Sequence, residues 1–333
     1  MKFIVTLGAL AAITTGSAAL AAQPLQPSPT CDRACLYKVL DDYLAARDAH
    51  DARKVRWAAR VKNTENNVEI RPDDGLWGTI TGRDAYEMRF ADPQTGSVAI
   101  FGVVQETKTR SPYATRLKVV DRAVAEAETL VIRPEDAGIP FVTADIKVRP
   151  VWNEMLAPAD RSPRQKMIDV ANGYFETLQL NDGKLHTEFT PDCDRREDGM
   201  QSTNNAGAGL NAANSGLNCS GQFQLGWYRY DDRIRDRRFV TVDEERGIVL
   251  AAGFIDHEGK LGEYTLTDGT KRTSNYRRPH TYVLFEAFRI KGAKIQQVEA
   301  VFHSVPYNMP SPWVDRRFGR PQRLKRPWAN SRA

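Results

Sequence analysis

The chain has 333 residues, a formal net charge of +5 at pH 7 and four cysteines. This length suits two domains, and no apolar run approaches the ~20 residues that cross a bilayer, which excludes a membrane-spanning protein. Much of the basic excess lies in a tail, residues 314–333, which we interpret as a solvated terminus; contact with lipid headgroups or an acidic polymer is the alternative. Stacking aromatics are sparse among these basic residues, so we expect no nucleic-acid partner.

The N-terminal stretch, residues 1–22, has the three parts of a secretory signal peptide. Lys2 supplies the charged region, residues 3–13 are apolar, and residues 19–21 include the small residues suited to cleavage. We therefore predict an exported protein, either periplasmic or secreted.

The first half of the mature chain predicts an α+β domain. Leu36, Leu40 and Tyr43 recur at helical spacing, which indicates a helix over residues 31–48. The other elements expected are a strand at 61–68, a short helix at 83–90 and antiparallel strands at 97–104, 113–120 and 124–133. Together these elements form a first domain, residues 31–133.

Residues 134–162 hold several prolines and no sustained period, and we interpret them as a linker on the surface. The same order of elements then returns in a second domain, residues 163–313. We expect, in order, a helix at 163–180, a strand around 191–199, a short helix at 222–234, strands at 238–242 and 247–256, an excursion at 263–275, and strands at 282–290 and 295–303.

Particular residues repeat along with the elements. The matching stretches and residues, first domain before second, are 43–51 with 174–182, Glu65 with Glu197, and Glu128 with Glu299. A strongly curved sheet wrapped over a long helix makes a cone with a mouth. Two such cones are expected to pack together through their sheet faces.

The four cysteines predict two disulfides, because an even number in an exported chain favours pairing. Proximity suggests Cys31–Cys35 and Cys193–Cys219, the second stapling a Gly- and Asn-rich segment at residues 199–221. The second bond would close a loop of about 25 residues and stabilise the fold by roughly 3 kcal/mol. The alternative is a zinc site with four thiolates, but paired C-x-x-C knuckles are missing. We expect no metal and no other cofactor.

The order of helix, strand, short helix and meander, written twice, resembles the nuclear transport factor 2-like superfamily. This cone-shaped α+β fold includes SnoaL-type cyclases, ketosteroid isomerase and scytalone dehydratase. The resemblance covers most of residues 31–133 and 163–313 and implies two tandem cones. The superfamily hosts enzymes and binding modules alike, so it implies no single activity. The Asp base and the Tyr/Asp oxyanion pair of ketosteroid isomerase have no residue-by-residue match here.

Several strings also resemble an uncharacterised family of exported bacterial and secreted fungal proteins. These strings are Thr64-Glu-Asn66, Gly75-Leu-Trp77, Ile234-Arg-Asp-Arg-Arg-Phe239, Val242-Asp-Glu-Glu-Arg-Gly247, and Val298-Glu-Ala-Val-Phe-His-Ser-Val-Pro-Tyr307 with Ser311-Pro-Trp313. This second resemblance implies export and carries no activity with it.

Ionisable side chains on strands expected to line the second cone are the candidates for chemistry. Alternation puts Glu299 and His303 on one face of the last strand, and Arg195 and Glu197 on one face of the cysteine-bearing strand. A carboxyl group buried in an apolar cone has a raised pKa. We therefore interpret Glu197 as a general base, His303 as its acid partner and Arg195 as an anchor for an anion. Alternatively, Glu197 closes a buried ion pair with Arg195 or Arg237.

Four further side chains are candidates to contact a ligand in or near the cone: Glu299, Arg237, Tyr174 and Tyr307. The Tyr307 phenol would close the mouth and donate a hydrogen bond, with simple packing as the alternative. His186, His257 and His280 are interpreted as structural histidines with satisfied hydrogen bonds. No H-E-x-x-H, G-x-S-x-G, P-loop or G-x-G-x-x-G pattern is present, so no metal, nucleophile or nucleotide motif points elsewhere.

Two functions follow from these observations. The first is an exported, cofactor-independent lyase, isomerase or dehydratase acting on a small molecule in the second cone. The alternative is a periplasmic binding or interaction protein without turnover, favoured by the polar segment at 199–221. The enzyme requires Glu197 and His303 within reach of one shared void, whereas a binding protein does not. The first domain has no match to His303 and is interpreted as structural.

Overall fold

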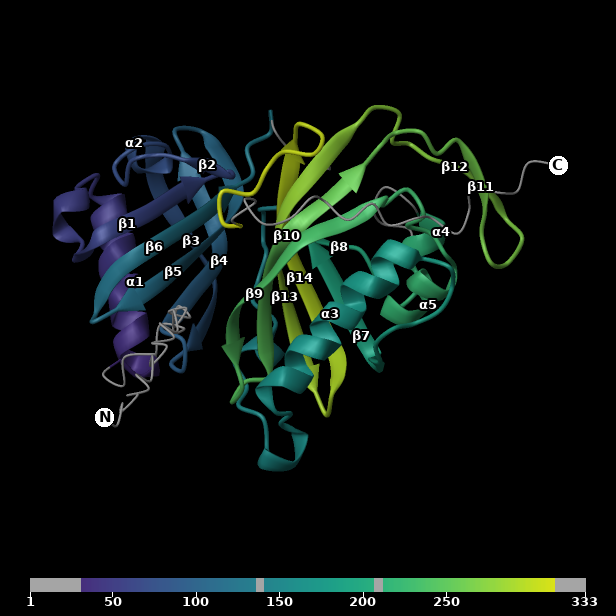
Figure 1. Ribbon diagram of the computed structural model, residues 1–333, viewed down its shortest axis with the longest axis horizontal. Helices are drawn as coiled ribbons and strands as arrows, with labels where there is room; N and C mark the ends of the chain where they lie inside the picture. The colour runs from purple at the N-terminus through teal and green to yellow at the C-terminus, as the bar shows by residue number, and fades with distance from the viewer. Residues whose placement is uncertain (1–30, 136–140, 207–211, 315–333) are drawn as a thin grey trace, which may run out of the picture.

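Two six-stranded sheets dominate the fold, each with one long helix on its outer side (Figure 1). The computed structural model describes residues 31–135, 141–206 and 212–314. The predicted signal peptide lies outside the described residues, as does the basic tail from residue 315 onward. Among the helices of these ranges, none is both long enough and apolar enough to cross a membrane.

The first unit consists of one sheet and the helix packed on it. Its elements are α1 (Arg33–Asp48), η1 (Ala52–Lys54), β1 (Trp57–Glu65), β2 (Val68–Glu69), α2 (Leu76–Thr79), β3 (Ile80–Asp92), β4 (Ser97–Glu106), β5 (Thr109–Val120) and β6 (Ala123–Val131). The Asp32 side chain caps α1 by accepting a hydrogen bond from the backbone N–H of Cys35 at 2.9 Å. The predicted apolar side of α1, including Leu36, Leu40 and Tyr43, is buried against the sheet.

The second unit repeats this plan with extra segments. Its elements are α3 (Arg164–Leu180), β7 (Phe189–Glu197), β8 (Met200–Gln201), α4 (Ala212–Ser215), α5 (Cys219–Gln224), β9 (Arg233–Asp243), β10 (Ile248–His257), β11 (Glu263–Thr265), β12 (Lys271–Thr273), β13 (His280–Lys291) and β14 (Lys294–Val305). The helix α3 ends at Asn181, whose left-handed conformation turns the chain away from the helix axis. The expected excursion is present as the β11–β12 hairpin.

Both sheets have the same topology. The strand orders are β2-β1-β6-β5-β4-β3 and β8-β7-β14-β13-β10-β9. In each sheet the first long strand pairs in parallel with the last strand, β1 with β6 and β7 with β14, while the other neighbours are antiparallel. The long parallel connection is therefore duplicated, not only the local hairpins.

The residue register is duplicated as well. Glu65 pairs with Thr129 across β1 and β6, and Glu197 pairs with Ala300 across β7 and β14. One residue earlier on each first strand, the partners are Glu128 and Glu299. The predicted equivalence of Glu65 with Glu197, and of Glu128 with Glu299, is thus confirmed.

Two predicted short helices are corrected by the structure. Residues 83–90 belong to β3, which pairs with β4 around a bulge between Arg83 and Glu87. That bulge interrupts the period-2 alternation, so the local pattern imitates a helix while sheet pairing overrides it. In the second unit only residues 222–224 of the predicted 222–234 helix are helical, at the end of α5, and β9 begins at Arg233.

The units pack sheet against sheet, as expected. Met88, Phe101 and Leu130 from the first sheet meet Leu250 and Phe285 from the second in one buried cluster. The segment between the units contributes to this interface instead of lying wholly on the surface, because Trp152 is 1% exposed within the same cluster. Burying apolar sheet faces against each other holds the two units together.

Candidate functional site

A cavity lies inside the second unit, between α3 and the concave side of its sheet. Its volume is about 90 Å³. The lining residues come from α3, β7, β10, β13, β14 and two loops: Tyr174, Leu178, Arg195, Glu197, Tyr228, Tyr230, Asp231, Ile255, His257, Tyr276, Tyr282, Leu284, Glu286, Ala300 and Phe302. The predicted residues Glu197, Arg195 and Tyr174 are therefore brought together at one cavity.

The guanidinium of Arg195 is held by several neighbours inside this cavity. Its Nη1 donates hydrogen bonds to Gln222 Oε1 and Tyr228 Oη, each at 3.1 Å, and its Nη2 pairs with Glu197. Burial by itself lowers the pKa of Arg195, but Glu197 and the other acidic and phenolic groups around the guanidinium together raise it well above its ordinary value. A guanidinium engaged in this way offers little to an incoming anion, so the geometry favours the ion-pair interpretation of Glu197 and Arg195.

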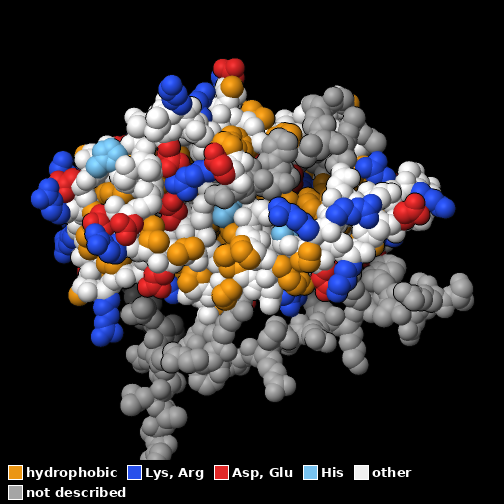
Figure 2. Space-filling model, turned by 90° about the horizontal axis from the view of Figure 1, so that it is seen from above, with side chains coloured by type: hydrophobic (Ala, Val, Ile, Leu, Met, Phe, Trp, Pro, Cys, Tyr) orange, Lys and Arg blue, Asp and Glu red, His pale blue; other side chains and the backbone are white. Residues whose placement is uncertain are grey.

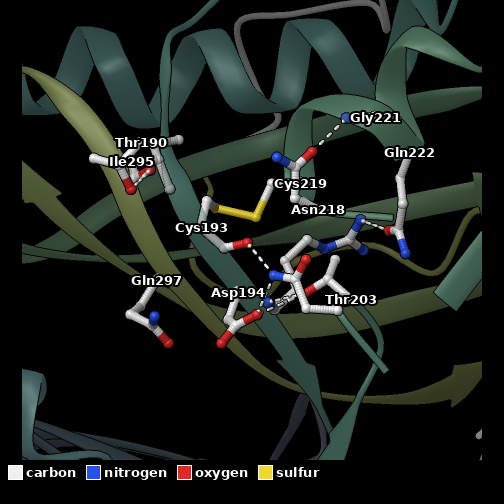
Figure 3. Close-up of a disulfide and its surroundings, with 12 residues drawn as sticks. Thr190, Cys193, Asp194, Thr203, Asn218, Cys219, Gly221, Gln222, Ile295 and Gln297 are labelled. Atoms are coloured by element: carbon white, nitrogen blue, oxygen red, sulfur yellow. Dashed lines mark hydrogen bonds between the residues drawn. A yellow bond between two sulfur atoms is a disulfide. The ribbon is translucent and has the colours of Figure 1, made fainter. Parts of the chain in front are cut away.

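The Cys193–Cys219 disulfide fastens the element that holds Arg195 (Figure 3). It joins β7 to the start of α5, three residues before Gln222. The Gln222 amide is fully buried and donates 3.1 Å to the carbonyl oxygen of Asn214, while its Oε1 accepts from Arg195. The predicted pairings Cys31–Cys35 and Cys193–Cys219 are both confirmed, which leaves no thiolate for the alternative zinc site.

Glu286 on β13 is a buried acid that the sequence interpretation missed. Its side chain points into the cavity and the residue is 4% exposed. Burial raises the pKa of Glu286 to about 8, with the Arg195 guanidinium working in the opposite direction. A pKa of about 8 favours the protonated form near pH 7, and in that form the carboxyl group is able to donate a hydrogen bond. Nothing in the alternation of β13 distinguished Glu286 from its apolar neighbours, because all of them are buried.

His257 and Asp231 form a second buried pair in the lining of the cavity. The His257 Nε2 lies 2.8 Å from Asp231 Oδ1, and both residues are at most 6% exposed. Burial raises the pKa of Asp231, and its hydrogen bond with His257 lowers it in part. The His257 Nδ1 has no hydrogen-bond partner among the described residues. The Asp231 carboxyl group thus orients the imidazole through Nε2.

His257 was interpreted above as a structural histidine, and its role as a cavity residue was missed. Its neighbours in sequence are acidic and indicate no partner for the ring, and the nearest ring partners come from other segments. The ring centroid of His257 lies 4.5 Å from that of His280 and 4.6 Å from that of Tyr276. Only the folding of β10 against β13 creates this group, so no local pattern could have indicated it.

Two predicted residues, Glu299 and His303, lie on the opposite face of the sheet from the cavity. The register of β14 shifts between Ile295 and Gln297, so Ile295 joins the helix-side core while Glu299 faces the first unit. There Glu299 contacts Tyr86 and lies 3.3 Å from the Arg196 Nη1. The predicted acid–base pair of Glu197 with His303 is therefore not formed, because the bulge changes which residues share a face.

Tyr307 and Arg237 also lie away from the cavity. Tyr307 is 39% exposed beyond the end of β14. Arg237 on β9 instead binds the outer side of α3, donating to Glu176 Oε1 at 2.6 Å and to Asn172 Oδ1 at 3.0 Å. Neither residue lines the cavity.

The corresponding space in the first unit is almost filled. It has a volume of about 10 Å³ and is lined by residues that include Tyr43, Arg47, Asn63 and Glu65. The Arg47 guanidinium is 1% exposed and lies over the Tyr113 ring, 4.9 Å from its centroid. The second unit is therefore where a small molecule has room to bind.

Comparison with known proteins identifies relatives without an assigned activity. Residues 160–302 match a family model described as a domain of unknown function (DUF8021). The match covers most of the second unit, including all of β7, β10 and β13. No curated protein matches the sequence.

Solved structures show only a distant likeness. A de novo designed protein with a curved β-sheet is 11% identical, with a TM-score of 0.25, and the match covers 31% of this chain and 89% of that chain. A protein of unknown function with a cystatin-like fold from Methylobium petroleophilum PM1 is 17% identical, with a TM-score of 0.26, covering 40% of this chain and 99% of that chain. At these TM-scores and identities neither structure establishes a function.

Proposed function

We propose that the protein is an exported pair of nuclear transport factor 2-like cones, of which the second carries the working site. Two duplicated sheets, each curved over one long helix, support this proposal for the fold. Two disulfides are typical of an oxidising environment outside the cytoplasm and support a periplasmic or secreted location.

We further propose that the second cone is a cofactor-independent enzyme that moves a proton on a small molecule, as a lyase, isomerase or dehydratase. One observation carries this proposal: His257, oriented by Asp231, and the protonated carboxyl group of Glu286 line the same cavity. A proton acceptor and a proton donor in one apolar space are what general acid–base catalysis requires.

In the proposed reaction, His257 Nδ1 accepts a proton from a carbon next to a carbonyl or hydroxyl-bearing carbon of the substrate. The Glu286 carboxyl group donates its hydrogen bond to the oxygen where negative charge develops, or gives its proton to a departing hydroxyl group. Asp231 stabilises the imidazolium that forms. Arg195 and Glu197 fix the wall of the site and take no proton.

The alternative is a binding protein that uses the cavity without turnover. The ion pair and hydrogen bonds that Arg195 makes with Glu197, Gln222 and Tyr228 favour it, because both Nη groups are then used to build the wall and not for chemistry. Both functions use the same lining residues, so they are separated only by whether the bound molecule changes.

The test is incubation of the mature protein with extracts and growth medium of its own cells, read by untargeted mass spectrometry. The variants are His257→Gln and Glu286→Gln, with His303→Gln as the matched control on the opposite face of the sheet. Each is first checked for an unchanged thermal transition.

A compound consumed by the wild type and by His303→Gln, and spared by His257→Gln, supports the enzyme and identifies its substrate. A compound that all four proteins retain unchanged and release on denaturation establishes the binding protein instead. If the cavity variants consume the compound as fast as the wild type does, the proposed catalytic roles are wrong.

A further inference from the structure

The second unit carries an excursion that the first unit lacks. In the first unit, β4 and β5 are joined directly by Thr107 and Lys108. At the equivalent place, between β10 and β13, the second unit has residues 258–279, which contain the β11–β12 hairpin. The excursion protrudes at one end of the molecule, with charged side chains on its surface (Figure 2). Since the sheet closes without it in the first unit, the excursion is not required by the fold.

The β11–β12 hairpin of the excursion contacts the loop after α5, which also lines the cavity. The Tyr264 hydroxyl donates to the carbonyl oxygen of Trp227 at 2.9 Å, and the Thr267 hydroxyl donates to the carbonyl oxygen of Gln224 at 2.7 Å. The Arg272 guanidinium lies 3.9 Å from the centroid of the Trp227 ring. These contacts hold the hairpin against the loop that follows α5, the same loop that supplies Tyr228, Tyr230 and Asp231 to the cavity.

From this hairpin the chain returns along the cavity and places Tyr276 in its wall. The Tyr276 ring centroid lies 4.6 Å from that of His257 and 4.6 Å from that of Tyr230. Its hydroxyl lies 3.4 Å from the Tyr282 hydroxyl. Tyr276 is thus the side chain of the excursion that covers the imidazole of His257.

Because the cavity is small, the position of Tyr276 controls which ligands enter it. A buried cavity of roughly 150 Å³ accepts benzene, whereas the cavity here measures about 90 Å³. A ring-sized ligand therefore exceeds this volume, and it either displaces a wall residue or extends toward the open side of the cavity. Tyr276 is the lining residue on a segment that the sheet does not need, while most of the others are fixed on α3 or on strands of the central sheet.

The lining also indicates which ligands would fit. Five tyrosines, one phenylalanine and His257 supply ring faces and edges, which favour flat ligands over puckered ones. Arg195 is occupied by its partners and Glu286 carries its proton near pH 7, so an anion gains no unpaired positive charge. The chemistry favours an uncharged, flat, oxygen-bearing ring.

We infer that the 258–279 excursion is the selectivity element of this cavity, and that Tyr276 admits ligands by size and flatness. The inference rests on the proposed function only in requiring that the cavity takes a small molecule. Tyr276 acts as a positioning residue, holding the ligand against His257, and takes no part in proton transfer.

The experiment measures affinities of three probes by titration calorimetry: phenol, its puckered analogue cyclohexanol, and the larger flat 1-naphthol. The proteins are the wild type, Tyr276→Ala, Tyr276→Phe and the control Tyr307→Ala, which removes an exposed aromatic outside the cavity. The wild type is expected to bind phenol more tightly than cyclohexanol. Tyr276→Ala is expected to shift the ratio of 1-naphthol to phenol affinity by about tenfold toward 1-naphthol.

Tyr276→Phe keeps the ring and is expected to keep the wild-type ratios, as is Tyr307→Ala. If phenol binds but Tyr276→Ala leaves every ratio unchanged, the selectivity role is wrong and the proposed function still stands. If no probe binds the wild type, the assignment of an uncharged flat ligand is wrong, and the mass-spectrometric test above decides the proposed function by itself.

Discussion

The two units differ in what fills the space between helix and sheet, although their backbones follow one plan. The first holds about 10 Å³ of space and the second about 90 Å³. At the helix position where the first unit has Arg47, the second has Leu178. Where β5 carries Tyr113, the matching position of β13 carries Leu284, since Tyr113 pairs with Val131 and Leu284 with the equivalent Phe302. Two large side chains fill the space in the first unit, and two smaller ones leave a cavity in the second.

The polar side chains that line the cavity of the second unit also stand where the first unit has other residues at equivalent positions. Glu286 occupies the place of Thr115, because Thr115 pairs with Thr129 and Glu286 with the equivalent Ala300. His257 ends β10 at the place where Glu106 ends β4. The comparison shows that a duplicated sheet gains a site through a few side chains and one excursion, with no change in strand order.

The largest expected effect is on the pH dependence of the free energy of unfolding, and it comes from Glu286, which has no acidic counterpart in the first unit. Its pKa is about 8 in the folded protein against an ordinary value of 4.5. Between these pH values the folded protein holds a proton that the unfolded chain releases, so the free energy of unfolding falls as pH rises. At 1.36 kcal/mol per pKa unit, the loss is at most roughly 5 kcal/mol. Glu286→Gln is expected to remove this part of the pH dependence.

Denaturant unfolding of the wild type and Glu286→Gln between pH 4.5 and pH 9 provides the measurement. The same substitution at Glu176, outside the cavity on α3, is the control. A wild-type curve that runs parallel to the Glu286→Gln curve over this range would show that Glu286 is ionised in the folded protein.

An intermediate effect is expected at a matched pair of turn residues. Asn66 has φ of 46° and binds both backbone groups of Val131, accepting from its N–H at 2.9 Å and donating to its carbonyl oxygen at 3.0 Å. Asp198 also has φ of 46° and accepts from the Phe302 N–H at 3.0 Å, but its buried Oδ2 has no partner among the described residues. Burial raises the pKa of Asp198 well above its ordinary value.

Asp198→Asn is expected to supply the missing donor and to increase the free energy of unfolding at pH 7 by about 1–3 kcal/mol. The reciprocal change Asn66→Asp is expected to decrease it by a similar amount. Because a raised pKa means that protonation stabilises the fold, the benefit of Asp198→Asn shrinks as pH falls toward 4. Chemical denaturation of both variants at pH 5 and pH 7 tests the predicted increase for Asp198→Asn and the predicted decrease for Asn66→Asp in the free energy of unfolding. A destabilised Asp198→Asn protein would contradict the equivalence of the two turns.

The smallest effect on the free energy of unfolding is expected at Arg47, one of the side chains that fill the space between helix and sheet in the first unit. None of the three guanidinium nitrogens of Arg47 has a hydrogen-bond partner among the described residues, and the ion pair with Asp48 spans 3.6 Å. A buried guanidinium without hydrogen bonds is costly to keep in the folded protein, and Asp48 retains its ion pair with Arg83 at 2.6 Å when Arg47 is replaced. Arg47→Leu is therefore expected to change the free energy of unfolding by less than about 1 kcal/mol while enlarging the first cavity.

Xenon binding followed by nuclear magnetic resonance measures the enlarged space directly. The reciprocal variant Leu178→Arg is expected to close the second cavity and abolish phenol binding. A loss of several kcal/mol in Arg47→Leu would mean that the guanidinium is better held than its contacts indicate.

Sequence reasoning reached the duplicated plan because both signals for it are local. Helical spacing marked α1 and α3, and the meander strands alternate or run apolar over short lengths. The two disulfides followed from proximity along the chain. The predicted helices at 83–90 and 222–234 are wrong, because a bulge in β3 and a turn after α5 interrupt the spacing of apolar residues. In both places pairing with distant strands decides the conformation.

At the site, the sequence identified Arg195, Glu197 and Tyr174 but not Glu286, His257 or Asp231. Arg195 and Glu197 follow the alternation of β7 beyond the register shift that lies between Phe189 and Asp194, and Tyr174 follows the helical spacing of α3. For Glu299 and His303 the same reasoning chose the wrong face, because one bulge at Ile295 reverses the alternation. A shift of one residue exchanges all the side chains of a strand between core and interface.

By itself the sequence determined the two-fold repeat, its long helices, its disulfides and the equivalence of Glu65 with Glu197, since each depends on residues near one another or on a repeated string. Only the tertiary structure decided which unit contains the larger cavity and which acidic residues and histidines line that cavity. The pKa of Glu286 depends on burial, and the pairing of His257 with Asp231 depends on contacts between separate segments of the chain. Burial and contact between distant segments are set only when the sheet closes over its helix.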